Sequence, residues 1–142
     1  CPTHANCHIQ CGWEGQQADT ACASRDIIWP VNGTGTIQCE GKQACDNVNF
    51  PHPPANEDYI LDCDYQQECY QADIYCPDNA RCDINCDATW ACQGATIDCS
   101  DSIDCNISCI GAGSCLDTNI IWSDNGQNTL TCHQPPFYDH DG

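Results

Sequence analysis

Cysteine is the residue type in this chain with the most evident chemistry. The sequence holds 17 cysteines in 142 residues, with no methionine and only three lysines and arginines. Cysteine at this density is typical of proteins that form disulfides in an oxidising, extracellular compartment. Metal binding by a cytosolic protein is the competing interpretation, but the chain contains no Cys-x-x-Cys pair. We therefore expect a secreted or cell-surface protein held together by disulfides.

Acidic side chains are the second group with recognisable chemistry. The formal charge is −18, which would repel nucleic acids and anionic membrane surfaces, so neither is an expected partner. Clustered carboxylates suit a hard cation such as Ca²⁺, which would offset part of this charge. The candidate Ca²⁺ ligands are Asp62, Asp64, Asp83 and Asp87. A solvated acidic face that only maintains solubility is an equally acceptable interpretation.

Two tripeptides of the Asn-x-Ser/Thr type begin at Asn32 and Asn106. In a secreted chain, both asparagines are candidate acceptors of N-linked glycans.

The sequence gives little support to an enzymatic function. Three basic residues cannot line the groove of a polysaccharide lyase, and nothing singles out one carboxylate pair for hydrolysis. We predict that the protein is not an enzyme, with no catalytic residues and no required cofactor. No apolar run is long enough to span a membrane.

An internal repeat must position these residues. Residues 76–98 and 99–121 have the same length of 23 and share every cysteine, and such a fixed period is the signature of a solenoid. Extending this register covers residues 1–142 as a single domain. The six expected coils are 1–28, 29–52, 53–75, 76–98, 99–121 and 122–142.

The cysteine columns of this repeat favour disulfides within each coil. A full coil such as 76–98 has four cysteine positions, which define four columns along the repeat. The first and second positions hold cysteine in the same three coils and lack it together in the others. Bonds between coils would leave Cys1 and Cys7 without a cysteine in the adjacent coil. The predicted pairs are Cys1–Cys7, Cys11–Cys22, Cys39–Cys45, Cys63–Cys69, Cys76–Cys82, Cys86–Cys92, Cys99–Cys105 and Cys109–Cys115. Bonds between coils stay open as the alternative, because stacked strands lie about 4.8 Å apart, within disulfide reach.

Between the cysteines the hydrophobic pattern has a period of two. In residues 82–86 and 105–109 the cysteines and the isoleucine share one face and polar residues share the other, as in a strand. A second strand is expected after the fourth cysteine, at residues 48–50, 72–76, 95–99 and 118–122. The expected fold is all-β: a parallel β-helix, which the crossover rule favours as right-handed.

The Cys-x5-Cys coils resemble the disulfide-rich β-helical antifreeze proteins of insects, in which the bridges also lie within a coil. The resemblance covers the cysteine spacing over most of the chain. That family presents ranks of Thr-Cys-Thr, whereas the residues flanking Cys63 and Cys86 are Asp and Asn. The spacing is also similar to that of cysteine-rich repeat proteins of protists and algae, which implies cell-surface or fibre material.

The ends of the solenoid suggest the function. Solenoids that stay monomeric usually close their ends with atypical capping segments. The chain starts at a cysteine in register and its tail after Cys132 is short, so we expect both ends to be open, and Cys132 to be unpaired or bonded between subunits. Head-to-tail contacts of this kind give filaments. We predict a subunit of an extracellular homopolymer. The alternative is a secreted module that binds Ca²⁺, carbohydrate or ice on a flat face and stays monomeric without its ligand.

Overall fold

The computed structural model describes residues 7–11, 22–23 and 35–133, and the structural statements below refer to these residues. They form two parallel β-sheets and include no helix, and hence none with the length and apolar character needed to cross a membrane. Sheet A consists, in spatial order, of β1 (Cys7–Cys11), β2 (Gly35–Cys39), β3 (Tyr59–Cys63), β5 (Arg81–Cys86), β7 (Asp104–Cys109) and β9 (Gln127–Cys132). Sheet B consists of β4 (Asp73–Tyr75), β6 (Thr96–Asp98) and β8 (Asn119–Ile121).

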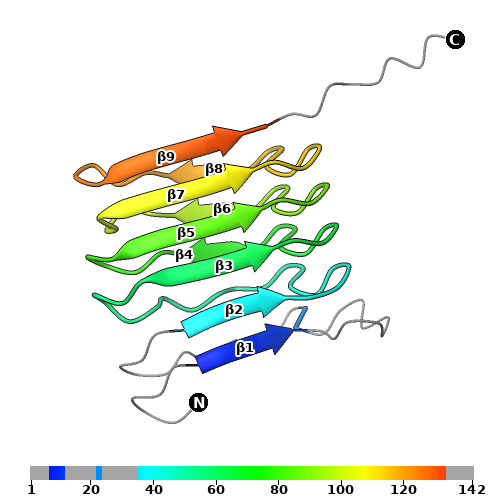
Figure 1. Ribbon diagram of the computed structural model, residues 1–142, viewed down its shortest axis with the longest axis horizontal. Coiled ribbons are helices and arrows are strands. Elements are labelled where there is room, and N and C mark those ends of the chain that lie inside the picture. The colour runs from blue at the N-terminus through cyan, green and yellow to red at the C-terminus, as the bar shows by residue number, and fades with distance from the viewer. Residues whose placement is uncertain (1–6, 12–21, 24–34, 134–142) are drawn as a thin grey trace, which may run out of the picture.

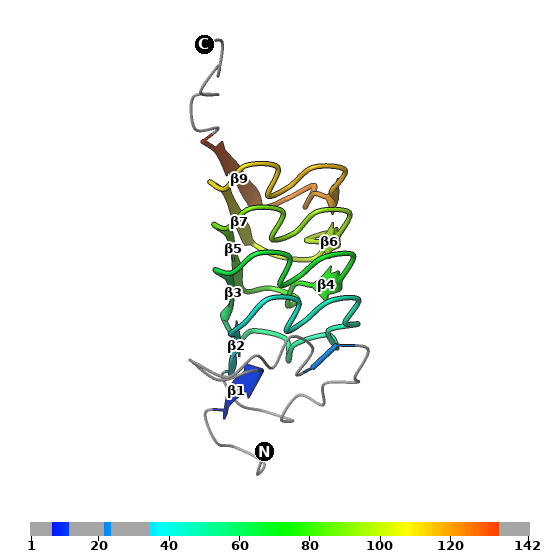
Figure 2. The same cartoon turned by 90° about the vertical axis from the view of Figure 1, so that its right-hand side faces the viewer.

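The chain winds as a β-solenoid in which each turn adds one strand to sheet A (Figure 1). From β3 onwards each strand of sheet A lies about one 23-residue repeat from its neighbour: Asp83 pairs with Asn106 at a separation of 23 residues. Figure 2 shows sheets A and B as opposite walls of the stack. The period read from the sequence is therefore the period of the fold.

Alternation along the strands decides which side chains enter the core. In β5, Cys82, Ile84 and Cys86 are buried, while Asp83 and Asn85 between them are half-buried on the outer face. Because neighbouring strands pair in the same register, side chains at equivalent inward positions form a column that runs along the stack. In the central column of sheet A, four consecutive side chains are at most 1% exposed: Ile37, Leu61, Ile84 and Ile107.

The turns after sheet A repeat a left-handed backbone conformation at a fixed position. Gln43, Gln67, Trp90 and Gly113 have φ values of 61°, 59°, 57° and 64°. Their coils are joined by hydrogen bonds that run from turn to turn, such as the one from the Cys69 amide to the Ala91 carbonyl at 2.8 Å. At Gly113 a Cβ atom would lie 2.7 Å from Cδ1 of Trp90, so the indole occupies space that only glycine leaves.

The second strand of each coil is shorter than expected. Sheet B strands contain three residues each, and residues 48–50 contribute only the isolated bridge from Asn49 to Asp73. In a later coil the Cys76 amide donates to Asp98 and extends the ladder. One coil earlier, the register of the isolated bridge places His52 at this position, and the ring of His52 stacks on Tyr75 with the centroids 4.5 Å apart.

Candidate functional site

The predicted cysteine pairs lie where the strands of sheet A enter their turns. Seven disulfides are present among the described residues, each within one coil, with Sγ–Sγ distances between 1.99 and 2.08 Å. They are Cys11–Cys22, Cys39–Cys45, Cys63–Cys69, Cys76–Cys82, Cys86–Cys92, Cys99–Cys105 and Cys109–Cys115. The predicted pair Cys1–Cys7 lies outside the described residues, because Cys1 is not described. The many bridges indicate an oxidising environment.

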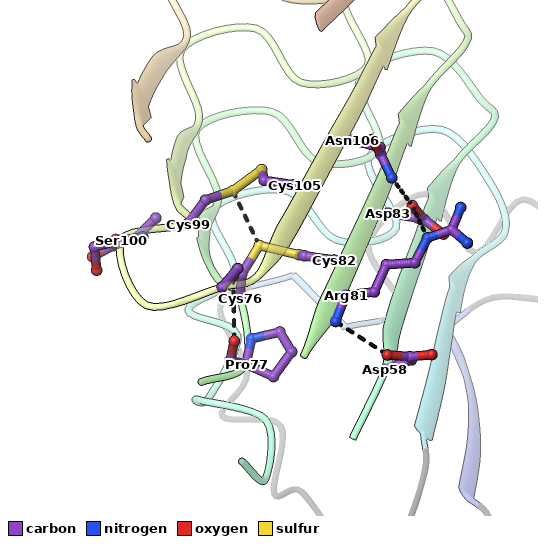
Figure 3. Close-up of a disulfide and its surroundings, with 12 residues drawn as sticks. Asp58, Cys76, Pro77, Arg81, Cys82, Asp83, Cys99, Ser100, Cys105 and Asn106 are labelled. Carbon is purple, nitrogen blue, oxygen red and sulfur yellow. Dashed lines mark hydrogen bonds and ion pairs between the residues drawn. A yellow bond between two sulfur atoms is a disulfide. The ribbon is translucent and has the colours of Figure 1, made fainter. Parts of the chain in front are cut away.

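Disulfides of neighbouring coils stack on one another. The Sγ atoms of Cys76 and Cys99 lie 3.4 Å apart (Figure 3). This is a van der Waals contact, since both sulfurs are in disulfides and neither carries a hydrogen. Three sulfurs also gather within 4.8 Å of one another at Cys63, Cys69 and Cys92. Because all three are oxidised, none offers the thiolate that a metal requires.

Cys132 is different from the other cysteines that the structure describes. It pairs in register with Cys109 of the preceding coil, but it is free and exposed. A hollow of about 220 Å³ beside it is lined by the Cys109–Cys115 disulfide, Leu116 and His133. In the four preceding coils this position bonds to the cysteine six residues further on, whereas residue 138 is tyrosine.

Two apolar side chains, those of Leu116 and Leu130, are exposed at the end of the stack that β9 forms. Leu130 continues the column of Ile107, but 47% of Leu130 is exposed and only 1% of Ile107. Leu116, in the last turn before β8, is 52% exposed. We call the surface formed by Leu116, Leu130 and Cys132 the end face.

The four candidate Ca²⁺ ligands do not gather into one group. Asp62 accepts a hydrogen bond from Asn85 at 2.7 Å, and Asp87 accepts one from Ser108 at 3.1 Å. Asp83 lies in the neighbouring row of sheet A. Among the described residues, the only groups of three or more metal-ligating side chains with their ligand atoms close together are cysteines.

The environment of Asp64 makes its carboxyl group a weaker acid. Partial burial raises its pKa, and the charges of Asp62 and Asp87 raise it further. The three carboxylates therefore repel one another without the cage of oxygen ligands that Ca²⁺ prefers.

Asp83 is held by the one arginine that the structure describes. Nε of Arg81 lies 2.9 Å from one Asp83 oxygen and 3.0 Å from the other. The hydrogen bond to Asp83 and the charge of that carboxylate raise the pKa of Arg81, and the charges of Asp104 and Asp58 raise it further. Its single positive charge lies near three aspartates and offsets part of their mutual repulsion.

A polar groove runs along the outer face of sheet A, next to Arg81. It has a volume of about 310 Å³ and is lined, among others, by Ile60, Arg81, Asp83, Asn106, Thr129 and Thr131. The predicted glycan acceptor Asn106 thus lies in this groove, and its Nδ2 donates to Asp83 at 2.8 Å. The other acceptor, Asn32, lies outside the described residues.

A buried carboxyl group at Glu68 escaped the sequence analysis. Its side chain is fully buried and accepts hydrogen bonds from the amides of Gly41, at 3.0 Å, and Tyr65, at 2.8 Å. Burial raises its pKa to about 8, against the opposing effect of these hydrogen bonds. Its position in the repeat could have revealed its burial. Glu68 stands directly before Cys69, and the residues that stand before the corresponding cysteines of the neighbouring coils are Ala44 and Ala91.

Comparison with protein-family models, with curated proteins and with solved structures found no match for this chain.

Proposed function

We propose that the chain is an extracellular structural protein whose subunits stack end to end into a filament. The end face is the observation that carries this proposal. Leu130 and Cys132 occupy columns that are buried one coil earlier, at Ile107 and Cys109, so a further coil placed on β9 would bury them. Burying one leucine side chain contributes about 1.5–3 kcal/mol, which makes the exposed end a favourable docking surface.

The register of sheet A specifies how a second copy would dock. β9 and β1 are the two edge strands of a sheet in which all neighbours are parallel. Parallel pairing of β9 with β1 of the next copy would align position 130 with position 9 and Cys132 with Cys11. Isoleucine and leucine would then follow one another without interruption along the filament. Such a heterologous contact does not close on itself and therefore gives a polymer.

The proposal includes finer features of the fold and setting. We take the solenoid to have six coils, to be right-handed and to be secreted, with a likeness to the disulfide-rich antifreeze proteins of insects and to the cysteine-rich repeat proteins of protists and algae. We assign it no catalytic activity. The disulfides supply rigidity, since closing a six-residue loop contributes about 2 kcal/mol each on the chain-entropy estimate.

A pair of substitutions tests the stacking. Leu130→Lys places a charge in the end face, and we expect it to abolish assembly because an unpaired charge would be buried at each contact. Ile60→Lys is the matched control, since Ile60 is 41% exposed but lies on β3, away from the end face. The measurement is sedimentation velocity of both variants and the wild type. Equal assembly of wild type and Leu130→Lys, or monomers for all three proteins, would refute the proposal.

The groove on sheet A favours a second candidate, a secreted binding module. Its lining offers hydrogen-bond donors and acceptors that suit the hydroxyl groups of a carbohydrate. A module of this kind would stay monomeric without its ligand, so the same sedimentation experiment separates the two functions.

A further inference from the structure

Asn106 stands in the middle of a single row of side chains along the groove. Ile60, Asp83, Asn106 and Thr129 are consecutive members of this row, from β3, β5, β7 and β9. Figure 3 shows the Asn106 side chain directed along the row towards Asp83, on the side of the sheet away from the stacked disulfides. The asparagine of the Asn-Ile-Ser tripeptide therefore belongs to the groove itself.

Asp83 determines how the amide of Asn106 is oriented. A carboxylate only accepts hydrogen bonds, so the atom 2.8 Å from Asp83 must be Nδ2 of Asn106 and not its oxygen. Arg81 holds the same carboxylate from the other side, at 2.9 Å. Nδ2 carries two hydrogens, and the bond to Asp83 uses only one of them. The second hydrogen is free to be replaced.

We propose that Asn106 carries an N-linked glycan and that the innermost sugar of this glycan occupies the groove on sheet A. In the attachment step, Nδ2 forms a bond to C1 of the sugar and loses one proton. The leaving group is the diphosphate of a lipid-linked oligosaccharide donor, whose bond to C1 breaks. No electrons are exchanged, and the remaining N–H can still donate to Asp83.

The groove suits a sugar in size and in chemistry. Its volume of about 310 Å³ lies at the lower end of ligand-sized cavities. Arg81 supplies a donor, Asp83 an acceptor, and Thr129 a hydroxyl that can do either. Ile60 adds an apolar contact. Since Arg81 offsets Asp83, the centre of the groove accommodates a neutral ligand better than the remainder of this acidic chain does.

A glycan at this position would make the outer face of sheet A a solvated side of the molecule. It would prevent lateral contacts through this face while leaving the end face uncovered, because the two surfaces point in different directions. The inference therefore does not rest on the filament, and either one can fail alone.

The test uses the full chain secreted from a eukaryotic host, with Asn32→Gln introduced so that Asn106 is the remaining acceptor. Ser108→Ala destroys the acceptor tripeptide without changing Asn106, and Ser108→Thr preserves it. We expect intact mass to show a glycan on the parent and on Ser108→Thr but not on Ser108→Ala. Peptide mapping after enzymatic release should find aspartate at position 106. An unmodified Asn106 in the secreted parent protein would overturn the proposal.

Two measurements on the glycosylated protein test the placement of the sugar. We expect nuclear Overhauser effects between the innermost sugar and the methyl groups of Ile60 and Thr129. Enzymatic release should be slower from the native than from the denatured protein, and a groove contributing ~1.4 kcal/mol would slow it about tenfold. Arg81→Ala should remove most of this protection. Equal release rates together with no Overhauser effects would overturn the placement in the groove.

Discussion

Replacing Glu68 by glutamine should change how the stability of the protein depends on pH. The Glu68 carboxyl group is fully buried, and its pKa is raised by burial from 4.5 to about 8. This difference means that the folded state binds the proton more tightly by on the order of 5 kcal/mol. Glutamine has nearly the same shape but no proton to lose in this range.

The direction of the effect follows from proton linkage. Below a pH of about 4.5 the carboxyl is protonated in both states, and its full contribution to stability is present. As the pH rises towards about 8, the unfolded chain releases the proton while the folded chain retains it, so stability falls. Above that pH both states are ionised and the loss is complete.

Guanidinium unfolding with the disulfides intact measures this effect. Both proteins are followed by tryptophan fluorescence at about pH 4 and about pH 9, on either side of the titration. Cys132 is alkylated beforehand, because its thiol could attack disulfides at the higher pH. Between the low and the high pH, we expect the free energy of unfolding of the wild type to fall by several kcal/mol more than that of Glu68→Gln. Asp78→Asn, which removes one exposed charge, controls for general repulsion. Parallel pH curves for wild type and Glu68→Gln would refute the reasoning.

Three further predictions follow from the turns and the acidic face. Gly113→Ala should lower the free energy of unfolding by about 1–3 kcal/mol because its Cβ would meet Trp90. The control Gly94→Ala shares the left-handed conformation but would meet only the flexible Gln71 side chain at 3.3 Å, so it should lower the free energy of unfolding less. Equal losses of stability in the two variants would contradict the steric argument. Arg81→Gln should lower the denaturation midpoint at low salt and recover at high salt, because Asp58, Asp83 and Asp104 lose their common counter-charge; a loss that does not depend on salt would count against this explanation. Ca²⁺ should bind no more tightly than about the millimolar range, since Asp62 and Asp87 already accept hydrogen bonds from Asn85 and Ser108; micromolar binding in a calorimetric titration would disprove this.

The backbone arrangement could be predicted because it depends on periodicity. The Cys-x-Ile-x-Cys pattern gives the inward face of sheet A, and the 23-residue period aligns Asp83 with Asn106 in neighbouring strands. Bonds within a coil were expected from the columns in which cysteines occur together, and the described disulfides have this form. Periodicity was less informative for sheet B, where residues 48–50 contribute only one isolated bridge and the other strands have three residues each.

The side-chain contacts of the candidate site could not be predicted in this way. A column shows which residues are neighbours, but it does not say which atoms meet. The repeat places Asp62 and Asp83 on the outer face of sheet A, but it does not show that Asp62 accepts a hydrogen bond from Asn85 and Asp83 one from Asn106. Glu68 was not noticed because its burial depends on the amides of two different turns, which lie far apart in the sequence.

Electron microscopy of the assembled chain tests the proposed end-to-end stacking most directly. If subunits stack through the end face and β1, six strands at about 4.8 Å each predict filaments with a subunit rise of about 25–30 Å. Continuous cross-β density along the axis should show no gap at the subunit boundary. If the wild type and the Leu130→Lys variant both appear as discrete particles of one subunit, the result would contradict the proposal.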